Sequence, residues 1–401
     1  MIAREIKPGI LSLSAIDWDR RLFDQLVPLP EGTTYNSYLV RGSEKTALID
    51  TVYAPFTVEY LETLKQAGLR KLDYIIANHG EQDHSGSIPA VLALYPEAKV
   101  VTNTHCRGLI ADALPVPDDR FIEVNDGDTL PLGNKTLQFF LTPWVHWPDT
   151  MVTYLAEDKI LFTCDFLGSH LASSELYALD EARVEAAAKR YYAEIMMPFR
   201  MFIQKHLIKL APLKIDLIAP GHGPVYSRPE FILDLYRRWA SDEPLKQVVI
   251  PYVSMYGNTL QMVDYLVDRL TEAGLEVTPF NLIGGDTGKL ANTLVEASTV
   301  VFASSAVLAG PHPDIVGAAY LMNALRPKAR FASVIGSYGW GGNIVSKKIV
   351  ELLQGLKTQL HFFDPVLVKG LPKEEDFKAL DCLAEAISAA NQAMEQTAVA
   401  E

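Results

Sequence analysis

The sequence predicts two domains, a β-rich α+β first half and an α/β second half. Three observations support this expectation. The chain has 401 residues, which suits two domains with separate cores. Residues 1–245 contain many alternating strand-like runs, whereas residues 246–401 alternate short β-rich runs with helical stretches. Between them lies the polar segment 240–246, ASDEPLK, which is the predicted linker.

The first half combines strands bounded mostly by Gly, Asn or Asp turns with two helical patterns. Its strand-like runs are TTYNSYLV, KTALID, LDYIIA, KVVTNT, KTLQFFL, MVTYLA and KILFTC. Its helical patterns are PFTVEYLETLKQAGL and DEARVEAAAKRYYAEIMMPF. This mixture predicts an α+β domain.

The second half repeats a strand–helix alternation, which predicts a doubly wound parallel sheet covered by helices on both faces. Its strand-like runs are KQVVIPYV, LEVTPFNL, STVVFASS, ARFASVIG and LHFFDPV. The amphipathic run TLQMVDYLVDRL after the first strand is the first predicted helix.

Composition excludes several classes of function. A formal net charge of −13 argues against non-specific nucleic-acid binding, which needs Lys and Arg to neutralise phosphates. Three widely spaced cysteines encode neither a disulfide framework nor a four-thiolate iron or iron–sulfur site. The N-terminus lacks the apolar core of a signal peptide, and no run is long enough to span a membrane. We therefore expect a cytoplasmic protein without membrane contact.

Metal-binding side chains follow several strand-like runs of the first half. The loop NHGEQDHSGSIP follows LDYIIA, LTPWVHWPD follows KTLQFFL, and the GHG turn follows IDLIAP. A lone histidine is more often structural, but the joint pattern predicts one metal site, because strand ends that share an edge bring their loops together. The candidate ligands are His79, Glu81, Asp83, His84, His146, Asp165 and His222.

The three carboxylates of this set favour iron over zinc. Imidazole-rich sites satisfy zinc, whereas a redox iron centre gains from hard anionic oxygen ligands. The two oxygens of a carboxylate can also bridge two metals, a role that suits Asp165.

The motifs HGEQDH, VHWPDTM, ILFTCDFLGSH and GHG resemble those of the flavodiiron proteins, also called A-type flavoproteins. With GTTYNSYLV, YYAEIMMPF and the second half, the resemblance covers nearly the whole chain. It implies a metallo-β-lactamase-like αββα sandwich over residues 1–245 and a flavodoxin-like domain over residues 246–401. It also implies two irons, one held by His79, Glu81 and His146, the other by Asp83, His84 and His222, with Asp165 bridging.

Four residues near this site are less closely tied to the motifs of the family. The family does not always use the histidine equivalent to His84 as a ligand. Relatives often have Phe-Gly-Gln-His where this chain has LGSH. The resemblance therefore suggests only a supporting role for His170. Tyr191 and Tyr192 are candidates to line the pocket, with core packing as the alternative.

Three loops of the second half predict an FMN site at the strand carboxyl ends. SMYGNT precedes a helix, so its hydroxyls and backbone N–H groups can cradle a phosphate, as in flavodoxins. SSAVLAGPHP is less polar than its counterpart in many relatives, and GSYGWGGN offers aromatic surface to a flavin ring. No Walker A or G-x-G-x-x-G sequence supports ATP or NAD. The candidate contacts are Ser254, Met255, Tyr256, Gly257, Asn258, Thr259, Ser304, Ser305, Ala306, Val307, Ser337, Tyr338, Gly339, Trp340 and Gly341.

The resemblance implies an oxidoreductase that reduces O₂ to water, NO to N₂O, or both. Two alternatives are a dinuclear metal hydrolase fused to a flavodoxin-like domain, and an electron carrier with a relic first domain. Glu81 and the flavin loops argue against the first, and the complete ligand set argues against the second.

The chain carries no rubredoxin-like cysteine set, so a separate soluble donor must supply electrons, and the resemblance suggests rubredoxin or a reductase. It also implies a head-to-tail homodimer, or a dimer of dimers, in which one subunit's FMN serves the other's irons. We expect the junction near Trp147 and Trp340.

Overall fold

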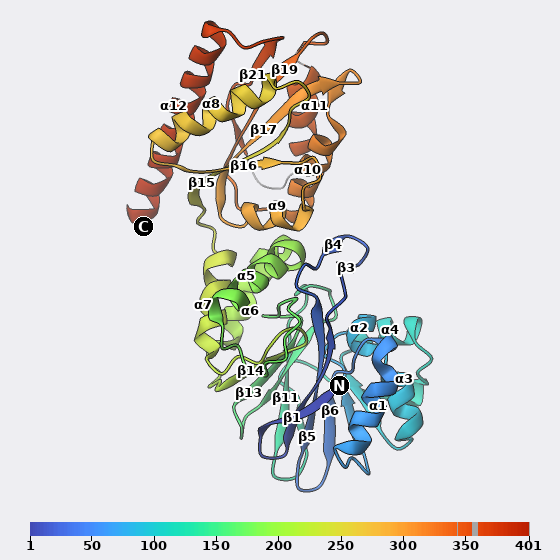
Figure 1. The fold of residues 1–401 in the computed structure, drawn as a ribbon. Coiled ribbons are helices and arrows are strands. Elements are labelled where there is room, and N and C mark those ends of the chain that lie inside the picture. The colour runs from blue at the N-terminus through green and yellow to red at the C-terminus, as the bar shows by residue number, and fades with distance from the viewer. Residues whose placement is uncertain (343, 355–359, 401) are drawn as a thin grey trace. The chain divides into compact units, whose positions relative to one another are not determined.

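The computed structural model forms two compact units, which are described separately (Figure 1). The described residues are 1–342, 344–354 and 360–400. The first unit contains residues 1–192 and 199–240, and the second contains residues 193–198 and those from 241 onward. The first unit thus ends at Ala240, five residues before the predicted boundary at 245. The residues that follow belong to the second unit: Glu243 forms an ion pair with Arg330 of that unit, and β15 begins at Leu245.

The first unit packs two mixed sheets face to face and covers their outer faces with helices, an αββα sandwich (Figure 1). The seven-stranded sheet is ordered β1 (Ile2–Lys7), β2 (Ile10–Asp17), β5 (Thr33–Arg41), β6 (Thr46–Ile49), β7 (Tyr74–Ile76), β8 (Lys99–Thr102) and β9 (Phe121–Glu123). The five-stranded sheet is ordered β10 (Thr129–Pro131), β11 (Thr136–Leu141), β12 (Met151–Leu155), β13 (Ile160–Cys164) and β14 (Leu217–Pro220).

Alternating side chains of both sheets form the central core, where Val40 and Ile49 lie in one cluster with Phe139 and Phe162. A second core lies under the helices of the seven-stranded sheet. The helices near that sheet are α1 (Thr57–Gln66), α2 (Gln82–Ser85), α3 (Ile88–Leu94) and α4 (Thr104–Ala113). Those near the five-stranded sheet are α5 (Glu181–Tyr191), α6 (Arg200–Leu210) and α7 (Pro229–Ala240).

The long helix predicted across residues 180–199 is interrupted. Helix α5 ends at Tyr191, a π-helical turn covers Tyr192–Met196, and a 3₁₀ turn covers Met197–Phe199 before α6 begins. Pro198 has no N–H to continue the helical ladder, which explains the break.

The second unit is a doubly wound parallel sheet, as predicted. Its strands are ordered β16 (Glu276–Asn281), β15 (Leu245–Val253), β17 (Ala297–Val307) and β19 (Phe331–Tyr338), followed by β20 (His361–Phe362) and β21 (Val366–Lys369). The run LHFFDPV therefore forms parts of two short strands rather than one, because Pro365 separates them and lacks an N–H for the ladder.

Helices cover both faces of this sheet (Figure 1). One face carries α8 (Asn258–Glu272) and α12 (Glu374–Ala400), and the other carries α9 (Thr287–Leu294), α10 (Pro313–Leu325) and α11 (Ile344–Leu353). Two short hairpins, β3–β4 (Leu22–Phe23 and Val27–Pro28) and the β17–β18 hairpin ending at Gly310–Pro311, extend from the units. No helix among the described residues is both long and apolar enough to cross a membrane.

Candidate metal centre and flavin cradle

The candidate ligands lie in loops that leave four strands. β13 pairs in parallel with β14, and β11 points the same way because two antiparallel pairings separate it from β13. The loops after these strands carry His146, Asp165 and His222, and the segment after β7 carries the remaining four ligands, two of which lie on the short helix α2. The predicted convergence of strand ends is therefore confirmed by the structure.

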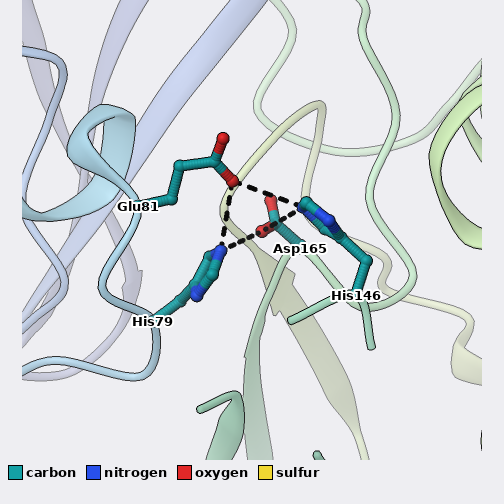
Figure 2. Close-up of side chains that lie close together, drawn as sticks. All are labelled: His79, Glu81, His146 and Asp165. Atoms are coloured by element: carbon teal, nitrogen blue, oxygen red, sulfur yellow. Dashed lines mark hydrogen bonds and ion pairs between the residues drawn. The ribbon is translucent and has the colours of Figure 1, made fainter. Parts of the chain in front are cut away.

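The seven side chains form two adjoining groups, in each of which the potential ligand atoms lie within 4.8 Å of one another. The first group contains His79, Glu81, His146 and Asp165 (Figure 2). The second contains Asp83, His84 and His222. In the first, Glu81 Oε2 lies 3.1 Å from His79 Nε2 and 3.3 Å from His146 Nε2.

Asp165 faces both groups with different oxygens. Its Oδ2 lies 3.4 Å from His79 Nε2 and 3.5 Å from His146 Nε2. Its Oδ1 lies 2.9 Å from His84 Nε2 and 3.3 Å from His222 Nε2. One carboxylate can therefore serve two cations, as a bridging ligand must.

The donor set fits metal ions because it leaves buried carboxylate oxygens without a hydrogen bond, facing the imidazoles of the same set. Both carboxylate oxygens of Asp83 and the Oδ2 of Asp165 lack a hydrogen bond, although both side chains are buried. Buried carboxylates are costly unless they are paired or bind a metal. Cys164, which lies beside His84 and Asp165, is a poor ligand because burial raises the pKa of its thiol well above the usual value.

The carboxylates create a field that favours positive charge. Burial lowers the pKa of His146, but its contacts with the carboxylates of Asp165 and Glu81 outweigh burial and raise this pKa to about 9. Burial likewise opposes protonation of His222, yet Asp165 and Asp83 raise its pKa to about 10. Burial raises the pKa of Glu81, whereas His146 and His79 lower it to about 2. Without metal, protons on the imidazoles supply the positive charge that cations would supply.

Supporting contacts fix the imidazoles. Asp149 Oδ2 accepts from Gly80 N at 2.7 Å and lies 3.0 Å from His79 Nδ1, leaving His79 Nε2 directed at Glu81. His222 Nδ1 lies 2.6 Å from the carbonyl oxygen of Thr34. Sequence reasoning did not single out Asp149, although it belongs to the motif VHWPDTM and is an acidic residue just before a buried strand.

A glycine beside His222 permits close packing. A Cβ at Gly221 would lie 2.7 Å from His84 Cε1, so a larger residue would displace this imidazole. The GHG turn therefore has a steric role as well as supplying a ligand.

The three secondary candidates have different surroundings. The Tyr191 hydroxyl donates to Asp165 Oδ1 at 3.1 Å, but that of Tyr192 donates to the Trp239 carbonyl oxygen at 3.1 Å. The structure thus directs the Tyr191 hydroxyl, and not that of Tyr192, to the metal centre, and the site role of Tyr192 stays a prediction. His170 stays outside both groups: its ring centroid lies 4.8 Å from that of His222 and its Nδ1 2.8 Å from Thr33 Oγ1.

The three predicted flavin loops meet at one edge of the second unit. Thr259 Oγ1 lies 3.0 Å from Ser305 Oγ and 2.9 Å from Ser337 Oγ, so hydroxyls from all three loops form a cluster. The Ser254 hydroxyl accepts from Leu260 N at 3.1 Å. These contacts place the first turn of α8, with its backbone N–H groups, beside two neighbouring strand ends.

The rim of this cradle is apolar and exposed. Tyr256 is 88% exposed and Trp340 69% exposed, and Met255 is also exposed. The Ser304 hydroxyl accepts a hydrogen bond from His312 N, just after the β17–β18 hairpin. Ala306 and Val307 lie in β17, where they pair with β18. Gly257 and Gly341 adopt positive φ angles. Asn258 is the first residue of α8, and Tyr338 is the last residue of β19, directly before Gly339. Asn343, the last residue of the third loop, lies outside the described residues.

Comparisons with known proteins identify relatives that are similar to this chain over most of its length. Residues 33–223 match the model of the ODP family beta lactamase. The chain is 34% identical over 380 residues to the nitric oxide reductase of Moorella thermoacetica, covering 93% of this chain and 95% of that protein. It is 33% identical to the anaerobic nitric oxide reductase flavorubredoxin of Escherichia coli, covering 86% of this chain and 74% of that protein.

Solved structures show the same overall resemblance. Rubredoxin oxygen:oxidoreductase from Desulfovibrio gigas aligns with a TM-score of 0.93 and 30% identity, covering 98% of this chain and 99% of that one. The flavodiiron protein of Giardia intestinalis aligns with a TM-score of 0.91 and 27% identity, covering 99% of this chain and 98% of that one.

Proposed function

This chain belongs to the flavodiiron proteins, and we propose from that premise that it reduces O₂ to water, NO to N₂O, or both. It is an oxidoreductase that uses a non-haem diiron site and FMN. His79, Glu81 and His146 would hold one iron, and Asp83, His84 and His222 the other.

The observation that carries this proposal is the placement of Asp165 between the two groups. Its separate oxygens face separate sets of imidazoles, which is the arrangement that two adjacent cations require. A dinuclear site would supply redox electrons to a small diatomic substrate. The protein side chains would hold both ions close together and limit the access of water to them.

Glu81 favours iron and argues against the hydrolase alternative. It gives the first group two carboxylates beside two imidazoles, a harder ligand set than the imidazole-rich sites that satisfy zinc. The hydroxyl cluster of the second unit also has no use in a hydrolase, whereas it suits the phosphate of FMN.

Electrons would come from a separate donor protein. The described residues hold three free cysteines, so the chain has no thiolate set for an iron centre of its own. One structural relative is named for rubredoxin, which makes a rubredoxin or a comparable soluble reductase the donor that we propose. The cytoplasm is the compartment that suits such a donor.

We further propose a head-to-tail homodimer, alone or paired as a dimer of dimers, in which the FMN of one subunit serves the irons of its partner. Exposed aromatic and apolar residues support this. Trp147 is half-buried beside His146, and Trp340 and Tyr256 are exposed on the flavin rim. Such residues commonly anchor interfaces.

Metal and flavin analysis tests the central proposal. Protein from iron-replete cells should contain about two irons per chain, by the ligand count, together with FMN. His79→Ala should lose iron and keep FMN, because the flavin cradle lies in the other unit. Stoichiometric zinc with negligible iron, in protein that still turns over O₂ or NO, would refute the proposal.

Subunit complementation tests the dimer. FMN-loaded His79→Ala protein is mixed, without free FMN, with flavin-depleted Ser254→Ala/Thr259→Ala protein under conditions that exchange subunits. Transfer between subunits predicts recovered reductase activity in the heterodimer, whereas transfer within a subunit predicts none. A fully active monomer in sedimentation would contradict the dimer.

A further inference from the structure

The metal centre is open to solvent on one side only. Five of its seven side chains are almost fully buried, whereas His146 and Glu81 keep 11% and 13% of their side-chain surface exposed. Both belong to the first group (Figure 2). Any electron that comes from outside this unit therefore meets the first group before the second.

Trp147 lies on this open side and contacts both imidazoles of the first group. Its ring centroid is 5.0 Å from that of His79 and 6.1 Å from that of His146. Both contacts are edge-to-face, with interplanar angles of 88° and 78°. The indole is only half-buried, so one side chain joins the surface to two candidate ligands.

The backbone holds Trp147 in this position. Its carbonyl oxygen accepts from Trp144 N at 2.7 Å and from Thr150 Oγ1 at 3.1 Å. Trp144 points elsewhere, because its ring stacks on Phe199 at 6.2 Å and packs near Phe202. The same loop therefore contains two tryptophans, of which only Trp147 contacts metal-binding imidazoles.

We propose that Trp147 is the electron-entry residue of the metal centre, through which electrons from reduced flavin reach the metal held by His79 and His146. This inference depends on the proposed function. Electron tunnelling is faster through contacting π systems than through gaps or solvent, and the indole is the largest π system in contact with these ligands. With FMN and metal bound, each electron would pass from the reduced flavin to the metal, and no bond at Trp147 would form or break.

The test compares Trp147→Leu and Trp147→Phe with the matched control Trp144→Leu. Flavin-free, iron-loaded protein is reduced by a flash-generated one-electron donor, and metal reduction is followed optically. Trp147→Leu should slow this step about tenfold, equivalent to about 1.4 kcal/mol in activation free energy. Trp147→Phe, which keeps a ring, should be intermediate, and Trp144→Leu should match the unmodified protein. Iron content and midpoint potential should stay unchanged in all three.

A second measurement examines the contact itself. Titration of metal-free protein with Co²⁺ should quench tryptophan fluorescence, and this quenching should largely disappear in Trp147→Phe but persist in Trp144→Phe.

Three outcomes would overturn the proposal. Unchanged reduction rates in Trp147→Leu would show that electrons enter through Glu81 or His146 directly. A shifted midpoint potential that accounts for the slower rate, or loss of iron from both Trp147 variants, would make Trp147 a structural residue. Failure of the proposed function would look different, since the unmodified protein would then lack iron or FMN.

Discussion

The metal centre and the flavin cradle both lie at strand carboxyl ends, but they are built from opposite chemistry. The metal centre consists of buried imidazoles and carboxylates, three of whose oxygens lack hydrogen-bond partners within the protein. The cradle consists of neutral hydroxyls that satisfy one another, beneath an exposed aromatic rim. The first site is charged and complete only with cations, whereas the second is already hydrogen-bonded without its ligand.

This difference determines how each site responds to change. Metal ligands act through individual side-chain atoms, so the loss of one ligand leaves a neighbouring charge buried and unpaired. A phosphate cradle acts largely through backbone N–H groups and a helix N-terminus, which survive substitution of a side chain. We therefore expect large effects of single changes at the metal centre and small ones at the cradle.

Removal of the shared carboxylate should have the largest effect. Asp165→Ala should lower the iron content from about two per chain to below one, because both groups lose an oxygen ligand, and FMN should be retained. Metal analysis of purified protein measures this, with Asp112→Ala on the exposed face of α4 as the control. Full iron content in Asp165→Ala would contradict the bridging role.

Acidification should weaken metal uptake by the metal-free protein. The pKa values of His146 and His222, about 9 and about 10, mean that both are protonated at neutral pH until metal displaces the protons. Affinity should rise about tenfold per pH unit for each proton displaced, as pH approaches 9. Calorimetry in buffers of different ionisation enthalpy would count the released protons. Binding without proton release would contradict this prediction.

The same shifts predict the pH dependence of stability without metal. Both pKa values are raised above the unfolded value, so these imidazoles stabilise the metal-free fold fully below about pH 6.5. That contribution should disappear as the pH rises through 9 to 10. Thermal unfolding of metal-free protein across this interval measures the loss, and the metal-loaded protein serves as the control because its imidazoles carry no proton to lose.

Substitution of a supporting residue should have a smaller effect than that of a ligand. Asp149→Asn keeps the shape of the side chain but removes the charge that faces His79 Nδ1. Such contacts typically contribute about 10- to 100-fold to metal affinity. Competition with a chelator measures the change, and unaltered affinity would show that the Gly80 contact alone positions the loop.

The cradle should show the smallest effect. Thr259→Ala removes one hydroxyl of the cluster and should weaken FMN binding by about 1 kcal/mol, roughly fivefold. The Ser254→Ala/Thr259→Ala pair should weaken it further without changing iron content. Fluorescence titration of flavin-free protein with FMN measures both, with Thr271→Ala at the exposed end of α8 as the control. A loss of more than a hundredfold from Thr259→Ala would contradict a backbone-based cradle.

The sequence by itself indicated a β-rich first half and the strand–helix alternation of the doubly wound second half, whereas the two-layered sandwich followed only from the resemblance to a known family. It also determined the ligand types, because histidines and carboxylates directly after apolar runs are a local property of the chain. Likewise, hydroxyls and a glycine before an amphipathic run marked SMYGNT as a candidate phosphate loop.

The tertiary structure decided the relations between these loops. The π turn after Tyr191 directs that hydroxyl, and not the one at Tyr192, to Asp165. Asp149 meets His79 from a distant loop, and the two oxygens of Asp165 separate the ligands into two groups. No local pattern encodes such contacts, because they depend on how two sheets align their edges, and a shift of one residue in register would direct each side chain to the opposite face.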